Sequence, residues 1–280
     1  IGKEQKDDRP LKTWPYPSGS VVKLFVLAGH RNMEDERAFT QDLKALKGKS
    51  GLLKDDERIA FRYRLGGGFK TSAGWEPLGP AGSYDTFGPE LSFAAALSRK
   101  SPDRFAVAKF THSGSQIIDW TPEGSSAKSR NLYPSFLAFV RESMKDLADR
   151  GHRAELAGIF YHLGENDLAF GPYRNEAAKR IASIVARSRQ DLGLADLKWF
   201  VSQNPTDPTD PSDAAKTAKS KSKAKADDVA DRLDKLAAKD PKFVHLRIAD
   251  LPGRESKLVI TTAGIVALGE AMADGYLKHR

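Results

Sequence analysis

Three short polar stretches, residues 29–33, 111–115 and 163–167, hold most of the side chains in this chain that could do chemistry. Together with the residue just before the third stretch, they supply imidazoles, hydroxyls and carboxylates on His30, His112, His162, Ser113, Ser115, Glu165 and Asp167. A histidine can activate a neighbouring hydroxyl as a nucleophile, and a histidine paired with a carboxylate can activate water. The residue types therefore indicate a hydrolase-like site, for which Ser113 or Ser115 with His112 is one candidate arrangement.

Each polar stretch follows an apolar run of the kind that forms a strand buried on both faces. Such runs predict five strands, at residues 21–28, 105–110, 154–162, 197–202 and 243–248. Apolar residues at helical spacing and capping signals predict helices at 90–98, 131–150, 173–192, 229–238 and 262–277, and the acids at 34–36 suit the start of another. The alternation predicts a three-layer α/β/α sandwich with an open, roughly five-stranded parallel sheet. Ligands of such sheets bind beyond the carboxyl ends of the strands, so the three polar stretches should converge on one pocket.

The remaining segments are expected to lie outside this regular framework. Residues 1–20 predict an extended N-terminal arm whose aromatic side chains pack onto a single domain at 21–280. Residues 47–83 predict a long irregular surface loop, and their glycine triplet at 66–68 lacks the Gly-Lys-Ser/Thr sequence of a phosphate loop. Residues 206–228 are a low-complexity run of lysine, alanine, serine and aspartate, which predicts a mobile loop or exposed spacer.

Composition narrows the classes of function. The chain has 280 residues, 40% of them hydrophobic and 29% charged, and no apolar run long enough to span a bilayer. It has no cysteine, which excludes disulfides and thiolate chemistry. The net charge is +8, but much of the lysine excess lies in 206–228 and no nucleic-acid motif is present, so we expect no nucleic-acid partner. The sequence begins at Ile1 without methionine, which favours a secreted or periplasmic mature form.

Five blocks, in order, resemble the SGNH (GDSL-type) hydrolases, in the branch of the sialate O-acetylesterases and acetylxylan esterases, carbohydrate esterase family six. Residues 28–33, Ala-Gly-His-Arg-Asn-Met, are similar to the A-G-Q-S-N-M block, and residues 161–167 to the W-H-Q-G-E-x-D block. The other blocks are Trp75, Pro77 and Leu78 followed by 88–93, then 109–114 followed by Trp120, and 256–264. The resemblance covers about 21–277 and implies the flavodoxin-like fold of these hydrolases.

The same resemblance marks departures at the three triad positions and at one further pocket position. The family uses a Ser–His–Asp triad, whose serine is activated by the imidazole and whose oxyanion is held by backbone amides. The serine position corresponds to Arg31, and the aspartate and histidine positions correspond to Ser256 and Val259, although Asp250 and His245 lie upstream of that block. An arginine offers no oxygen to accept an acyl group, and a valine cannot carry a proton. A glutamine of the family pocket corresponds to Leu163.

These departures leave two hypotheses. The first is a non-catalytic protein that binds a saccharide or another anionic small molecule, for instance an acidic or sulfated glycan, through Arg31 at a helix start. The alternative to ligand binding within this hypothesis is that Arg31 forms an ion pair with Glu165 or Asp167 and only closes the former catalytic pocket. The second is an active carbohydrate O-acetylesterase or other hydrolase with relocated catalytic residues.

The expected pocket residues are His30, Arg31, Asn32, Gly88, His112, Ser113, Gly164, Glu165, Asn166 and Asp167. His30, His112 and His162 could in principle bind a metal together with Glu165 or Asp167, but no ligand spacing in the sequence favours one. We therefore expect neither a metal nor a cofactor.

Overall fold

A mostly parallel sheet forms the centre of the molecule. The structure is a computed structural model that describes residues 5–7, 9–34, 36–169, 171–204, 229–248, 251–252 and 259–280, with the side chains of 5–7 and Glu165 left aside. Within these residues the sheet has nine strands in the order β1-β4-β3-β6-β2-β7-β8-β9, and β5 pairs with β3. The predicted loop at 206–228 and the triad-equivalent position Ser256 lie outside the described residues.

The predicted parallel strands are confirmed. They are β2 (Val21–Gly29), β6 (Phe105–Thr111), β7 (Arg153–Leu163), β8 (Trp199–Gln203) and the shorter β9 (Phe243–His245). Strand β2 is apolar from Leu24 to Ala28 because both of its faces are covered there: Phe25 and Leu27 belong to one core, and Leu24 and Val26 to the other. This two-sided burial is the reason that its sequence shows a run rather than an alternation.

The prediction of an irregular loop at 47–83 is wrong. This segment contains the short helix η1 (Ser50–Leu53) and the strands β3 (Asp56–Leu65), β4 (Lys70–Ser72) and β5 (Glu76–Leu78). Strand β3 pairs in parallel with β6 and is therefore a sixth parallel strand. Arginines at alternate positions, Arg62 and Arg64, hid the strand, although buried Phe61, Tyr63 and Leu65 between them have the period of two that a strand requires.

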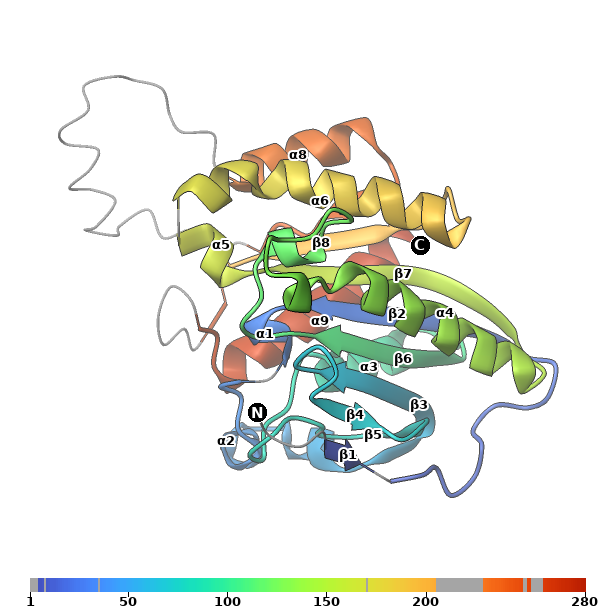
Figure 1. Ribbon diagram of the computed structural model, residues 1–280. Coiled ribbons are helices and arrows are strands. Elements are labelled where there is room, and N and C mark those ends of the chain that lie inside the picture. Colours follow the sequence, from blue (N-terminus) through green and yellow to red (C-terminus); the bar gives the residue numbers. More distant parts are fainter. Residues whose placement is uncertain are drawn as a thin grey trace.

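Helices cover both faces of the sheet (Figure 1). Helices α3 (Glu90–Lys100) and α9 (Thr262–His279) lie against each other on one face. Helices α4 (Tyr133–Asp149), α6 (Gly171–Leu192) and α8 (Val229–Lys239) cover the other. The α/β/α architecture is thus confirmed. In the described residues no helix is long and apolar enough to cross a membrane.

The helix expected after β2 is much shorter than its acids suggested. Helix α1 (Arg31–Glu34) has a single turn, and α2 (Thr40–Ala45) follows after a break. Further one-turn elements are η2 (Ile117–Trp120), η3 (Lys128–Arg130) and α5 (Glu165–Ala169). Helix α1 and η2 lie at the carboxyl ends of β2 and β6, so short elements rather than long helices frame that edge of the sheet.

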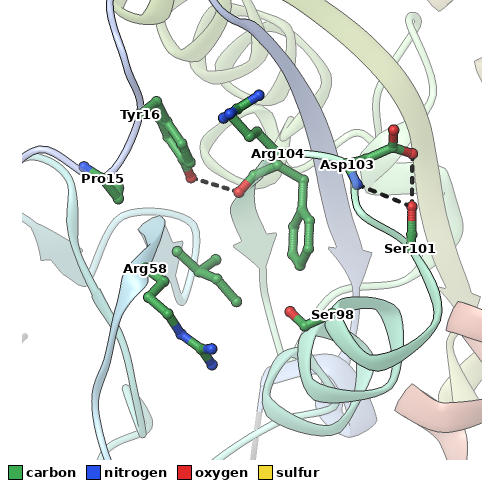
Figure 2. Close-up of a pocket in the computed structure, with 9 residues that line it drawn as sticks. Pro15, Tyr16, Arg58, Ser98, Ser101, Asp103 and Arg104 are labelled. Carbon is green, nitrogen blue, oxygen red and sulfur yellow. Dashed lines mark hydrogen bonds between the residues drawn. The ribbon is translucent and has the colours of Figure 1, made fainter.

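The N-terminal arm crosses the opposite edge, where the parallel strands begin. Strand β1 (Gln5–Asp7) pairs with β4, and Tyr16 is buried. The Tyr16 hydroxyl donates to Phe105 O at 2.5 Å and accepts from Ala60 N at 2.9 Å. Beside it lies a cavity of about 170 Å³ flanked by Arg58, Ser101 and Asp103 (Figure 2). The arm therefore bridges the starts of β3 and β6.

Candidate functional site

The carboxyl ends of three adjacent strands bring the polar stretches together. Gly29, at the end of β2, pairs with Thr111 of β6 on one side and with His162 of β7 on the other. His112 N donates to Gly29 O at 3.1 Å, which fixes the second stretch to the first. The expected meeting of the three stretches at one edge is therefore what the structure shows.

Two glycines make this close approach possible. Gly29 has a φ of +145°, and a Cβ there would lie 2.8 Å from both His162 O and the Met33 Cγ. A Cβ on Gly164 would lie 2.7 Å from the His30 ring. Any side chain at either position would push the turns apart, so both glycines are required by packing.

His30 is a buried structural histidine. Its Nδ1 lies 3.0 Å from Ser115 O and 2.8 Å from Ser115 Oγ, and its Nε2 lies 2.5 Å from the Tyr161 hydroxyl. Burial lowers the pKa of His30 to about 3, the bond to Ser115 opposes this, and His162 and His112 add to the lowering. Nδ1–H donating to the carbonyl and Nε2 accepting from Tyr161 fit this neutral state. With both nitrogens engaged, the ring holds the turn rather than serving as a base.

His162 is held in a second buried network. Its Nε2 donates to Asn204 Oδ1 at 2.8 Å, and its Nδ1 accepts from Ser202 Oγ at 2.9 Å. Burial lowers the pKa of His162 to about 4, against a smaller opposing effect of Asn204. Ser202 and Asn204 come from β8 and the residue that follows it, and no motif in the sequence pointed to them.

Asn32 extends this network to the C-terminal part of the chain. Its Nδ2 donates to Asn204 Oδ1 at 3.3 Å, and its Oδ1 accepts from Ile260 N at 3.0 Å. Val259, the residue next to Ile260, is thereby placed beside the turn that carries Arg31. Residue 259 thus lies at the same edge of the sheet as residue 31.

Arg31 pairs with an acid that the sequence did not suggest. Its Nε lies 2.7 Å from Glu36 Oε2, and the two side chains are 27% and 43% exposed. The side chain of Glu165, one of the two expected partners, is not described. The other, Asp167, accepts from Ile117 N at 2.9 Å through Oδ2. A counter-charge from the same loop therefore already faces the guanidinium.

The helix start offers Arg31 little help in attracting an anion. The amides of Met33 and Glu34 both donate to His30 O at 2.9 Å, inside the single turn of α1. A helix of one turn also has almost no macrodipole. The expectation of an anion site built from a helix N-terminus is therefore corrected: any attraction must come from the guanidinium itself.

Glu34 ties the edge together. Its Oε2 accepts from Gly66 N at 2.9 Å and from Ser113 N at 2.8 Å. Gly67 N donates to Thr111 O at 2.9 Å, and a Cβ on Gly67 would lie 3.0 Å from the His112 ring. The glycine triplet, expected to be surface loop, thus packs against the site. Its only signal in the sequence was its location in the turn between two strands, β3 and β4, that were not recognised.

A cavity of about 320 Å³ opens beside Glu34. Its polar wall includes Glu34, Glu36 and Ser113, and its outer part includes Phe69, Lys70 and Tyr84. Glu36 is also the partner of Arg31, so the cavity and the nucleophile-equivalent position share a side chain. This is the most accessible part of the candidate site.

Other expected residues fall into different roles. Asp167 is buried, and burial raises its pKa to about 7, while the Ile117 amide opposes the rise. Asp167 Oδ1 and His112 Nδ1 have no hydrogen-bond partner within the described residues. Asn166 and Ser113 are half-buried. Ser115 is buried, its Oγ donating to His112 O at 2.7 Å and accepting from Trp120 Nε1 at 3.0 Å, so it is enclosed.

Gly88 belongs to a buried ion pair rather than to the cavity. Its N–H donates to Glu90 Oε1 at 3.1 Å, and Glu90 Oε2 lies 2.9 Å from Lys109 Nζ. Both charged side chains are 0% exposed.

In the described residues no three His, Asp or Glu side chains are grouped so that they could hold a metal ion.

A family model described as "Carbohydrate esterase, sialic acid-specific acetylesterase" matches residues 21–278. No curated protein matches the sequence.

Solved structures share the fold. A protein from Arabidopsis thaliana superimposes with a TM-score of 0.65 at 19% identity, covering 94% of this chain and 99% of that one. NanS gives 0.62 at 14%, covering 94% and 98%. A carbohydrate acetylesterase from Xanthomonas citri gives 0.58 at 16%, covering 90% of this chain and 55% of that one.

Proposed function

The chain belongs to the sialic acid-specific acetylesterase family of carbohydrate esterases, and from that premise we propose that it is a saccharide-binding member without the family's serine-based hydrolysis. The observation that carries the proposal is Arg31, ion-paired with Glu36, at the position that the resemblance to the family assigns to the nucleophilic serine. A guanidinium cannot form an acyl-enzyme, and the neighbouring position 259 holds valine, which cannot act as a base.

The surrounding histidines support the same proposal. His30 and His162 are buried, neutral and fully hydrogen-bonded, so neither can shuttle protons to a substrate. Ser115, the serine whose Oγ lies 2.8 Å from His30 Nδ1, is enclosed as well. What remains accessible is a cavity lined by hydroxyl, carboxylate and aromatic groups, which suits binding of a sugar.

An acidic or sulfated glycan is the finer form of the proposal. A carboxylate or sulfate can take two parallel hydrogen bonds from a guanidinium, and Arg31 is the cation at the turn. Such a group would have to displace Glu36 from Arg31, so we expect its binding to weaken as salt is added.

Two measurements test the proposal. Release of acetate from acetylated xylan fragments, acetylated sialic acid and an aryl acetate should not exceed the rate in buffer. Calorimetric titration should detect binding of sialyllactose or of a sulfated oligosaccharide, and Arg31→Gln should weaken it roughly tenfold if a charge-assisted pair is lost. Absence of heat and of thermal stabilisation with every neutral, acidic and sulfated sugar would contradict the binding function.

A hydrolase with relocated chemistry is the second candidate. It is favoured by His112, which is half-buried next to Ser113 and has an Nδ1 without a partner in the described residues. The carboxyl of Asp167, whose pKa is about 7, could also exchange protons near neutrality. Ester hydrolysis that survives Arg31→Ala and is abolished by His112→Ala would establish this candidate and displace the first.

A further inference from the structure

Exposed aromatic side chains gather at one cavity. Among the described residues the exposed large hydrophobic side chains are Val21, Phe69, Tyr84 and Leu194. Two of these, Phe69 at 44% and Tyr84 at 92% exposure, line the 320 Å³ cavity beside Glu34. Folding does not bury the Tyr84 ring, so packing does not account for an aromatic residue there.

Tyr84 lies in a strained segment of the backbone. Tyr84 and Asp85 have φ values of 60° and 57°, a left-handed conformation that side chains other than glycine rarely adopt. Neighbouring bonds maintain it: Thr40 N donates to Asp85 O at 2.9 Å, Gly82 N to Thr86 O at 3.1 Å, and Lys70 Nζ to Ala81 O at 2.8 Å. Strain maintained by its surroundings at an exposed residue indicates a function for that residue.

The cavity walls have the chemistry of a sugar site. Hydroxyl and carboxylate groups of Ser113 and Glu36 can exchange hydrogen bonds with sugar hydroxyls. An aromatic rim offers a flat apolar surface to the C–H face of a pyranose ring. The cavity walls carry two carboxylates, Glu34 and Glu36, and one ammonium group, that of Lys70. This excess of negative charge disfavours a ligand group that is itself negatively charged.

We propose that Phe69 and Tyr84 form the aromatic platform of a subsite that takes one uncharged pyranose residue of a bound oligosaccharide. The proposal rests on the saccharide-binding function proposed above and names the sugar that the cavity accepts. A charged unit of the same oligosaccharide would bind at Arg31, outside this subsite. The two places adjoin, because Glu36 both lines the cavity and pairs with Arg31.

The test removes each ring and follows binding of xylohexaose, a neutral probe, and sialyllactose, an acidic one. Tyr84→Asn removes the ring but keeps a residue that tolerates left-handed backbone, and Tyr84→Phe keeps the ring. Phe69→Ala removes the second ring. Leu194→Ala is the matched control, because Leu194 is an exposed apolar side chain that does not line the cavity.

We expect Tyr84→Asn and Phe69→Ala each to raise the Kd for xylohexaose roughly tenfold, which corresponds to the loss of one aromatic stacking contact. Tyr84→Phe and Leu194→Ala should leave the Kd within about twofold. Unchanged affinity in both ring-removing variants, with wild-type binding intact, would overturn the subsite and leave the proposed function standing. Acetate release from acetylated xylan fragments, measured on the same variants, reports on hydrolysis separately: turnover with a KM raised by Tyr84→Asn would retain the subsite and remove the non-catalytic assignment. If neither sugar binds the wild-type chain, both proposals fail.

Discussion

The two edges of the central sheet treat their polar groups in opposite ways. At the carboxyl ends of β2, β6 and β7, His30 and His162 are buried and paired with neutral partners. At the amino ends, charges are paired near the surface, as in Lys23 with Asp103 at 2.7 Å, whose side chains are 25% and 31% exposed.

This difference indicates at which positions a charged or polar residue can be replaced with little loss of stability. Partly exposed ion pairs contribute little to stability, whereas buried polar groups are costly when a partner is lost. The carboxyl-end framework must therefore stay intact whether or not the site hydrolyses anything. Arg31 is the exception at that edge, since it is half-buried and faces Glu36.

The largest expected effect comes from the buried pair beneath the site. Lys109→Met leaves Glu90 as a buried charge without its cation and should lower the free energy of unfolding by about 3–5 kcal/mol. Urea denaturation measures the loss. Adding Glu90→Gln removes the charge while keeping an acceptor for Gly88 N, and should recover most of it.

The matched change at the other edge is Lys23→Met, which should cost less than about 1 kcal/mol. Equal losses from Lys109→Met and Lys23→Met would break the comparison between the two edges.

Acid should destabilise the protein through its carboxyl-end histidines. The folded pKa values of His30 and His162 are about 3 and about 4, below the ordinary value of 6.5. Between pH 6.5 and 4 the unfolded chain binds protons that the folded chain does not. The contribution of these two histidines to stability is therefore complete above about pH 6.5 and is lost as the pH is lowered. At pH 5 each histidine should account for about 2 kcal/mol of the loss.

Denaturation curves recorded from pH 8 to pH 5 on an Asp167→Asn background give this slope, because the Asp167 carboxyl, whose pKa is raised to about 7, contributes a slope of opposite sign over the same range. Histidine resonances provide an independent check, because the rings of His30 and His162 should remain neutral at pH 5. Normal titration of both rings near pH 6.5 in the folded protein would show that the carboxyl edge is more open to water than its burial indicates.

The smallest effects are expected at the amino edge. Tyr16→Phe removes a hydroxyl that bonds both Phe105 O and Ala60 N, and should lower the free energy of unfolding by about 1–2 kcal/mol. Arg58→Ala, in the same cavity wall, should change it by less than about 0.5 kcal/mol, because this side chain is 82% exposed. Thermal denaturation resolves the two variants. A larger loss of stability from Arg58→Ala than from Tyr16→Phe would show that the Arg58 charge, and not the Tyr16 hydroxyl, stabilises this end of the sheet.

Much of the fold could be predicted from the sequence because strands buried on both faces leave continuous apolar runs. The resemblance to the acetylesterase family is confirmed by the match over residues 21–278. Strand β3 escaped because Arg62 and Arg64 interrupt its apolar residues; Arg62 nevertheless lies over the rings of Trp75 and Phe139. A charged side chain can lie along an apolar surface, and a pattern of charges does not reveal it.

The candidate site was predictable in its location and not in its partners. Parallel topology was sufficient to bring residues 29–33, 111–115 and 163–167 to one edge. The pairing of Arg31 with Glu36 was not foreseen, because it depends on a helix that ends after one turn. The partnership of His162 with Ser202 and Asn204 depends on side-chain directions fixed by the register of β7 and β8.

The bond between Asn32 Oδ1 and Ile260 N has a consequence for synthesis. It joins positions 228 residues apart, so the turn at Asn32 receives this contact only after the intervening residues up to Ile260 have been translated. At ribosomal speeds of about 5–20 residues per second, the wait is roughly 10–45 s. During that time the first turn must persist without its last hydrogen bond. The nascent chain therefore has no finished site, and a ligand cannot assist folding until Ile260 has emerged.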